Sequence, residues 1–167
     1  NELVDFVEVE TAWHHVLWNE EERKKYNVPW WRSGWLRWRT WRCPEAGMAH
    51  LIWASGLKNH DFCSPGDPEY GKPTPQAIAA KEIIDLYVWW KHIRPQRLDP
   101  HDASGWTEIC ANRRKDSDDI LWEDKTPEEA AATKKALDMS NDLEAQYDQE
   151  DEEMMIRLIK VRNSLWT

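Results

Sequence analysis

Tryptophan and arginine side chains alternate in the stretch PWWRSGWLRWRTWR, residues 29–42 of this 167-residue chain. Indole and guanidinium planes stack on nucleic-acid bases, so this stretch could bind a single strand or a small nucleotide. The same rings could anchor a protein interface or fill a core. Because aromatic stripes at helical spacing are usually core, we expect packing, with the arginines directed to acidic side chains of residues 116–153. The candidate interaction residues are Trp30, Trp31, Trp35, Arg37, Trp38, Arg39 and Arg42.

Two pairs of carboxylates could hold a divalent metal ion. Glu82 and Asp85 form an ExxD pattern, and Glu144 and Asp148 share one face of a later helix. Hard cations such as Mg²⁺ or Mn²⁺ require several carboxylate oxygens, and all-α nucleotide pyrophosphohydrolases hold them between helices in this way. This pattern gives the alternative function of a metal-dependent all-α nucleotide hydrolase. A solvated face, with Asp85 paired to Lys81, explains the same residues, so we favour a chain without a cofactor.

Other residue types that carry chemistry give weaker patterns. Cys43, His50, His60 and Cys63 form C-x6-H-x9-H-x2-C, in which only the last pair has the spacing of zinc ligands. The segment DPHDASG (residues 99–105) combines acids with a histidine, but its composition is typical of turns. The sequence contains no G-x-S-x-G, glycine-rich phosphate loop or C-x-x-C. Three widely spaced cysteines indicate free thiols in a reducing compartment.

Negative charge is concentrated near the end of the chain. The net charge is −9, and residues 116–153 hold fifteen acidic and three basic side chains, whereas residues 1–60 hold eight of each. An acidic chain disfavours binding to nucleic acid, which depends on neutralising phosphates. No apolar run approaches the roughly 20 residues that span a bilayer, and no signal peptide is visible. We therefore predict a protein that is neither secreted nor in a membrane.

Helical periodicity predicts the elements of the first half. One helix is expected over residues 11–26, and Ser33 can cap a second that carries the Trp/Arg stretch. Pro44 suits the first position of a third helix, and Gly56 suits its end. The residues of this third helix that are expected to face the core are Met48, Leu51 and Ile52.

The second half begins with a long loop rich in Pro and Gly, residues 57–75. Thr74 and Pro75 then begin a helix that Pro95 ends. A second Pro/Gly-rich loop, residues 94–106, leads into a short helix. The core seam of the helix after Pro75 is expected to consist of Ala79, Ile83, Leu86, Trp90 and Ile93.

The last helix has the strongest signals. Residues 115–126 are expected to form a mobile acidic connection, and the capping box TPEE that begins at Thr126 starts the helix. Its stripe is interrupted at Glu150, and Ser140-Asn141-Asp142 could divide it. The fold class is therefore all-α, an irregular bundle of five to seven helices in one domain, residues 1–167, with a long C-terminal helix and two long loops. The predicted stripe consists of Ala136, Ser140, Leu143, Tyr147, Met154, Leu158, Val161 and Leu165.

Three runs of the sequence resemble a family of proteins carried by tailed bacteriophages: WRCPEAGMAHLIWASGL, YGKPTPQAIAAKEIIDLYVWWKHIRPQRLDPHDASGW and YDQEDEEMMIRLIKVRNSLWT. The resemblance extends from about Trp13 to Thr167. It implies a viral origin, a small accessory role, and residence in the cytoplasm of an infected bacterium or in the virion. It brings no activity, cofactor or site residue.

The absence of a catalytic motif, the thirteen tryptophans and the segregated charge favour one function. We predict a non-enzymatic phage accessory protein that acts through protein–protein interaction, either as a virion or assembly component or as an inhibitor of a host factor. Self-association through the long C-terminal helix is the other partner prediction.

Overall fold

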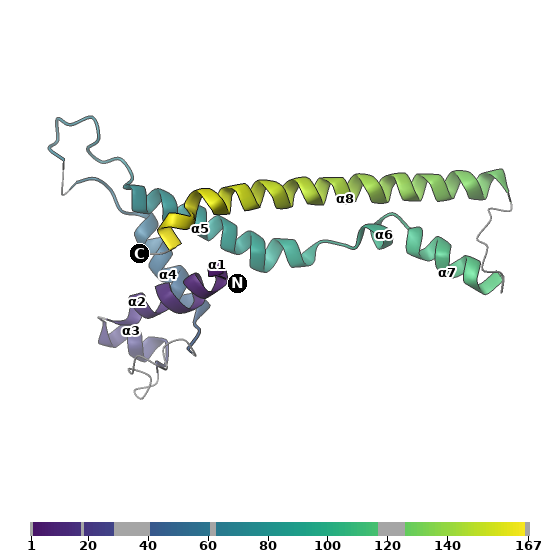
Figure 1. The fold of residues 1–167 in the computed structure, drawn as a ribbon. Helices are drawn as coiled ribbons and strands as arrows, with labels where there is room; N and C mark the ends of the chain where they lie inside the picture. Colours follow the sequence, from purple (N-terminus) through teal and green to yellow (C-terminus); the bar gives the residue numbers. More distant parts are fainter. Residues whose placement is uncertain (1, 18, 29–40, 61–62, 117–125, 166–167) are drawn as a thin grey trace. The chain divides into compact units, whose positions relative to one another are not determined.

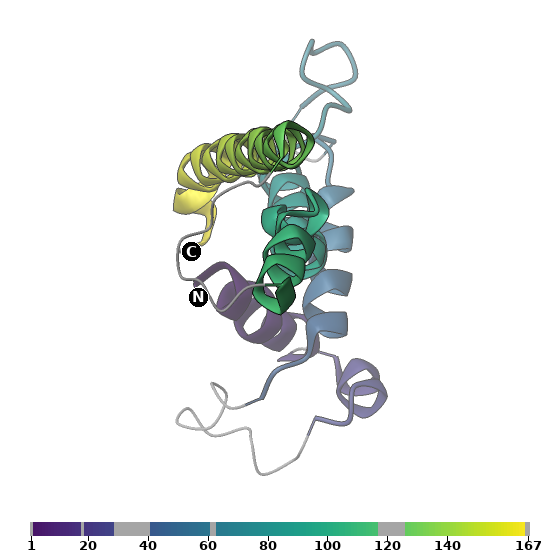
Figure 2. The ribbon, with the colours of Figure 1, turned by 90° about the vertical axis from the view of Figure 1, so that its right-hand side faces the viewer.

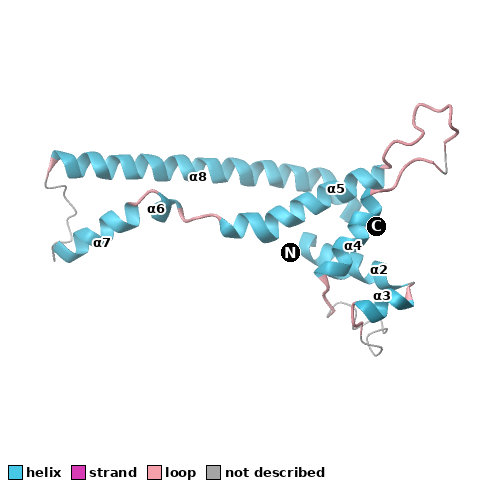
Figure 3. Cartoon of the chain, turned by 180° about the vertical axis from the view of Figure 1, so that it is seen from behind, coloured by secondary structure: helices cyan, strands magenta, loops and turns pink. Residues whose placement is uncertain are grey.

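The structure, a computed structural model, is built from helices (Figure 1). In the described residues Lys58 and Pro73 form an isolated antiparallel bridge, and no strand is present (Figure 3). The all-α prediction is thus confirmed, together with the long C-terminal helix. The structure describes residues 2–17, 19–28, 41–60, 63–116 and 126–165.

Contacts divide the chain into two compact units. The first comprises Asn1–Ile93 and Ile156–Thr167, and the second comprises Arg94–Met155. Whether the chain behaves as a single domain, as its length suggests, stays a prediction. None of the described helices is both long and apolar enough to cross a membrane.

The first unit begins with a series of helices that Asn19 divides before the last of them. The helices are α1 (Glu2–Asp5), the π-helix η1 (Phe6–Thr11), α2 (Ala12–Leu17) and α3 (Glu20–Lys25). Asn19 has an extended backbone, and its side chain accepts hydrogen bonds from the backbone N–H groups of Glu21 and Glu22. Such an N-cap begins a new helix. The single helix expected over residues 11–26 is therefore wrong, because Asn19 interrupts it.

Helix α4 (Pro44–Ser55) begins and ends where Pro44 and Gly56 predict. It packs against η1 through its smallest residues, since a side chain at Gly47 would overlap the backbone carbonyl of Val7. Leu51 is buried as expected, but Ile52 is 61% exposed. The inward prediction for Ile52 is wrong because the buried face is centred on Ala46, Gly47 and Leu51.

Helix α5 (Pro75–Val88) continues into the π-helix η4 (Trp89–Ile93). The Thr74 hydroxyl accepts a hydrogen bond from the N–H of Ala77, which confirms the predicted start. Ile83 and Leu86 are buried, but Ile93 is 51% exposed. The expected seam fails there because a π-helix has a wider turn, which shifts the positions that face the core.

The end of the chain belongs to the first unit. After α8 (Pro127–Val161), a short 3-10 helix, η6 (Arg162–Leu165), follows. Val161 and Leu165 are buried, as the predicted stripe requires. The C-terminal stripe therefore contributes to the core of this unit.

The second unit is an antiparallel helical hairpin. Its first arm contains η5 (Arg94–Gln96), α6 (Pro100–Ala103) and α7 (Trp106–Asp116), and its second arm is α8 up to Met155. Figures 1 and 2 show α7 beside the first half of α8. Successive contacts from Arg94 to Asp151, from His101 to Ser140 and from Arg113 to Thr133 establish the antiparallel order.

Helix α8 is continuous over 35 residues, about 52 Å at 1.5 Å per residue. The Thr126 hydroxyl accepts a hydrogen bond from the N–H of Glu129, so the capping box starts the helix as predicted. Ser140 does not interrupt the helix; it is buried within the predicted stripe. The acidic connection is expected at 115–126, but α7 extends to Asp116, and residues 117–125 lie outside the described residues.

Candidate functional site

The Trp/Arg stretch is described only at its end. Arg42 pairs with Asp5 and with Glu8, whose carboxylate oxygen lies 3.2 Å from Nη1. The expected pairing with residues 116–153 is thus wrong for Arg42. Trp41, 7% exposed, meets Trp13 edge to face at 6.1 Å between ring centroids and so belongs to the core. The other predicted interaction residues lie outside the described residues: Trp30, Trp31, Trp35, Arg37, Trp38 and Arg39.

Glu8 is the buried centre of a polar cluster that also contains the buried Tyr87 and the more exposed Lys91 and Arg42. Its carboxylate, 6% exposed, accepts a hydrogen bond of 2.9 Å from the Tyr87 hydroxyl and pairs with Lys91 at 2.9 Å. Burial alone would raise the pKa of Glu8, but the hydrogen bonds from Lys91 and Tyr87, together with the positive charges, hold it below the ordinary value. Burial and the Glu8 carboxylate raise the pKa of Tyr87.

This Glu8 cluster holds the first unit together. Glu8 lies on η1 and Lys91 on η4, so the two π-helices contribute opposite charges to one contact. The backbone carbonyl of Glu8 also accepts a hydrogen bond from the N–H of Cys43. Glu8 was not singled out from the sequence alone. The available signal was its position between two apolar residues, Val7 and Val9, which the structure shows to be buried.

The four predicted metal ligands do not form one cluster within either unit. Glu82 and Asp85 belong to the first unit, and Glu144 and Asp148 to the second. The carboxylate of Glu82 binds Arg157 at 2.6 Å, and Asp85 lies 3.6 Å from the same guanidinium. In the ranges that the structure describes, no three His, Cys, Asp or Glu side chains are placed to hold a metal ion.

Three histidines gather between α2 and α4. The ring of His50 lies 6.2 Å from the rings of both His14 and His15. His15 Nε2 is 3.3 Å from a carboxylate oxygen of Glu22, without the geometry of a hydrogen bond. Burial lowers the pKa of His50, and the charges of His14 and His15 lower it further. The cluster therefore favours a neutral His50 side chain.

The predicted C-x6-H-x9-H-x2-C pattern does not converge in the structure. His50 belongs to the histidine cluster, whereas the ring of His60 packs against Tyr70 at 5.0 Å between centroids. Cys43, Cys63 and the third cysteine are free thiols, as expected from their odd number.

The second unit brings Ser140, His101 and Glu144 into the order of a nucleophile, a base and a carboxylate. The Ser140 hydroxyl lies 3.0 Å from His101 Nδ1, and His101 Nε2 lies 4.0 Å from Glu144. However, Ser140 is only 1% exposed and lies inside a regular helix. A substrate could not reach this hydroxyl, so the arrangement binds the two arms of the hairpin together and is unsuited to catalysis.

Acidic residues of α8 pair with arginines of the opposite arm. Arg97 contacts Glu150 and Asp151, each at 2.6 Å, and Arg94 contacts Asp151 at 2.8 Å. The Arg97 guanidinium also lies over the Tyr147 ring, 4.8 Å from its centroid. These contacts explain the interruption of the predicted stripe at Glu150, because a charged side chain faces an arginine there.

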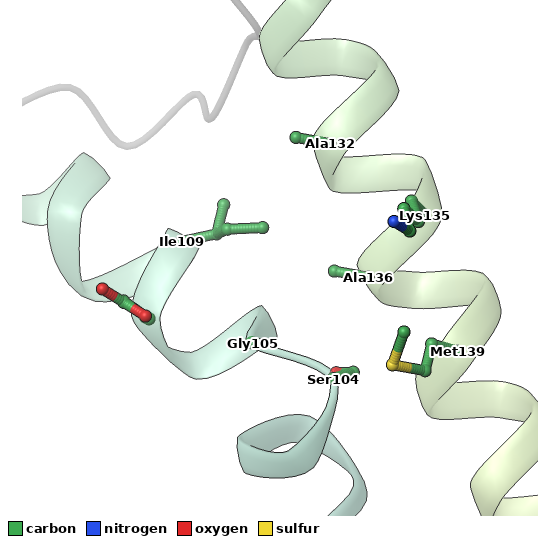
Figure 4. Close-up of a pocket in the computed structure, with 8 residues that line it drawn as sticks. Ser104, Gly105, Ile109, Ala132, Lys135, Ala136 and Met139 are labelled. Atoms are coloured by element: carbon green, nitrogen blue, oxygen red, sulfur yellow. The ribbon is translucent and has the colours of Figure 1, made fainter.

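An open groove lies between α7 and α8 in the second unit, with a volume of about 350 Å³. Figure 4 shows Ile109 of α7 directed toward Ala132 and Ala136 of α8 across this space. Glu108 and Lys135 add one charge of each sign. The groove can accept an apolar group, but it offers no cluster of reactive side chains.

Comparison with protein-family models, with curated proteins and with solved structures finds no match to this chain.

Proposed function

We propose that this chain is a non-enzymatic accessory protein of a tailed bacteriophage and acts through protein–protein contacts. The observation that carries the proposal is the exposure of large apolar side chains, on helix α4 and in the segment that joins η5 to α6. Ile52 and Trp53 on α4 are each 61% exposed, and Leu98 in the second unit is 67% exposed. Exposed aromatic and aliphatic groups of this size are the usual anchors of protein interfaces.

The state of the candidate reactive side chains favours a role in protein–protein contacts over a role in catalysis. Glu8 is enclosed by three donors, Glu82 is bound by Arg157, and Ser140 is buried. Each of these groups is engaged within the fold: Glu8 and Ser140 are inaccessible, and the Glu82 carboxylate is neutralised by Arg157, which disfavours a role as general base or nucleophile. The resemblance to phage proteins supports the infected bacterial cytoplasm or the virion as the place of action.

The experiment is affinity capture with the full chain from phage-infected cells, combined with light scattering on the purified protein. The double variant Ile52→Ser/Trp53→Ser is compared with Leu98→Ser, which removes an equally exposed side chain from the second unit. We expect the wild-type chain to enrich one protein, or to self-associate, and the double variant to lose this contact while keeping its helical circular dichroism. A chain that stays monomeric and captures nothing overturns the proposal.

A further inference from the structure

The groove between α7 and α8 has walls with the spacing of a helix-binding surface. Ala132, Lys135, Ala136 and Met139 follow one face of α8 at intervals of three and four residues. Gly105, just before α7, and Glu108 and Ile109, in its first turn, form the opposite wall. Residues at such intervals line one face of a helix, so two helical faces are directed at one space. Figure 4 shows this space between Ile109 and the two alanines of α8.

The first arm of this hairpin is incompletely packed. No residue from Trp106 to Arg114 is fully buried, and the apolar side chains of Trp106, Ile109 and Cys110 are only partly covered. On α8, Met139 at the edge of the groove is 41% exposed. Covering apolar surface is favourable, so a third helix in the groove would complete the packing that two helices leave unfinished.

The charge of the second unit selects the kind of helix that fits. Residues 94–155 hold eighteen acidic and eight basic side chains, a net charge of −10, against −9 for the whole chain. The exposed acids beside the groove include Glu108 of α7 and Asp142, which lies three residues beyond Met139 on α8. A second copy of this unit would bring like charges together, whereas a basic partner would be attracted.

We propose that the groove between α7 and α8 binds a basic amphipathic helix of a partner protein. A large apolar side chain of that helix enters the space between Ile109, Ala132 and Ala136, while its lysines or arginines face Glu108 and Asp142. The groove volume lies within the roughly 300–1,000 Å³ of ordinary ligand pockets. Helix-in-groove binding of this kind uses apolar anchors at helical spacing. The inference deepens the proposed function and rests on it.

The test uses synthetic helical peptides of about 15 residues, roughly four turns, and the full chain. One peptide has a leucine face and a lysine face, the second replaces lysine with glutamate, and the third replaces leucine with serine. Binding is followed by fluorescence anisotropy of labelled peptide. We expect the Leu/Lys peptide to bind, and its affinity to fall as the salt concentration is raised. The other two peptides should bind at least about tenfold more weakly than the Leu/Lys peptide.

Two matched variants locate the binding. Ala132→Trp fills the groove, whereas Ala131→Trp places the same ring on an exposed neighbouring position outside it. We expect Ala132→Trp to reduce affinity for the Leu/Lys peptide about tenfold or more and Ala131→Trp to leave it unchanged. Circular dichroism and thermal melting verify that both variants fold as the wild type does.

Several results would overturn the inference. If the Leu/Lys peptide bound Ala132→Trp and Ala131→Trp equally, the groove would not be the binding site. If the peptide with serine in place of leucine bound as tightly as the Leu/Lys peptide, the attraction would come from the acidic surface alone. Equal binding of the Leu/Glu peptide would remove the charge requirement, and self-association lost in Ala132→Trp would identify a second copy as the occupant. If no peptide binds while a partner is still captured through Ile52 and Trp53, the groove inference fails and the proposed function survives.

Discussion

Arg157 binds Glu82 through two hydrogen bonds, with Nε donating to Oε1 at 2.6 Å and Nη2 donating to Oε2 at 3.1 Å. The two residues are 75 positions apart in the sequence, and both belong to the first unit. The contact therefore fixes the end of the chain to α5. The Arg157 guanidinium holds the pKa of Glu82 below its ordinary value.

Replacing Arg157 with Met is expected to lower the free energy of unfolding by about 1 kcal/mol, because a two-point pair is lost at a site about one-third exposed. Lys134→Met is the control, since Lys134 is exposed on the same helix. Urea denaturation of both variants measures the difference. An equal loss in both would mean that the pair adds nothing to stability.

Replacing Glu8 with Leu is expected to cost about 1–2 kcal/mol, because the buried Tyr87 hydroxyl would lose its acceptor. Lys91 and Arg42, 40% and 48% exposed, would stay hydrated. Glu10→Leu makes the same change at an exposed position of the same π-helix and should be nearly neutral. Thermal and urea denaturation of the two variants provide the comparison. Similar values for both would contradict a structural role for the Glu8 cluster.

The Glu8 carboxyl also predicts a response to acid. Its pKa in the folded state lies below the ordinary 4.5, so the unfolded chain binds the proton more readily. The stability from Glu8 is therefore complete above about pH 4.5 and is lost as the pH falls through the lower folded pKa. The stability difference between the wild type and Glu8→Leu should narrow over that range when urea denaturation is repeated in acid.

Lowering the pH from about 7.5 to about 5.5 is expected to destabilise the first unit through His50. The folded pKa of His50 lies below 6.5, so the unfolded state binds more protons and stability falls as the pH drops below that value. The rings around it are those of His14 and His15 of α2 and of Trp53, and Glu22 of α3 in turn faces His15.

The variant His50→Phe should show a smaller fall in melting temperature over this range than the wild type does. His60→Phe is the control, because His60 lies in the exposed loop and packs against Tyr70. Identical pH profiles for the wild type and His50→Phe would mean that the histidine cluster has no effect on stability.

Replacing Gly47 with Ala is expected to destabilise the first unit by about 3 kcal/mol, since the new methyl group would overlap the backbone carbonyl of Val7. Gly56→Ala provides the comparison. A Cβ there would lie 3.4 Å from the carbonyl oxygen of Trp53, an ordinary contact. Melting temperatures of the two variants test the closeness of η1 and α4, and a Gly47→Ala protein as stable as Gly56→Ala would refute it.

Local signals predicted the helix starts well. Thr74 and Thr126 each accept a hydrogen bond from the backbone N–H three residues later, as their positions before Pro suggest. These caps depend on neighbouring residues alone, so the sequence contains the necessary information. The stripe of α8 was predictable for a similar reason, because its spacing reflects one regular helix.

Features that depend on distant residues were not predictable. The exposure of Ile93 follows from a π-helical turn, and that of Ile52 from the close approach of α4 to η1 at Gly47. The Glu8 cluster joins residues up to 83 positions apart, Glu8 and Lys91, and no local pattern specifies such a contact. The same limit applies to Arg42, whose partners are near the start of the chain.

Val28 and Trp41 pack in one hydrophobic cluster with Ala12, Val16 and Ala46. The residues on either side of the undescribed part of the Trp/Arg stretch are therefore anchored in the same core. For evolution, this makes these two flanking positions the constrained ones, because a smaller or polar side chain at either would disturb the packing of α2 and α4 together. Related chains should therefore keep apolar residues at both positions.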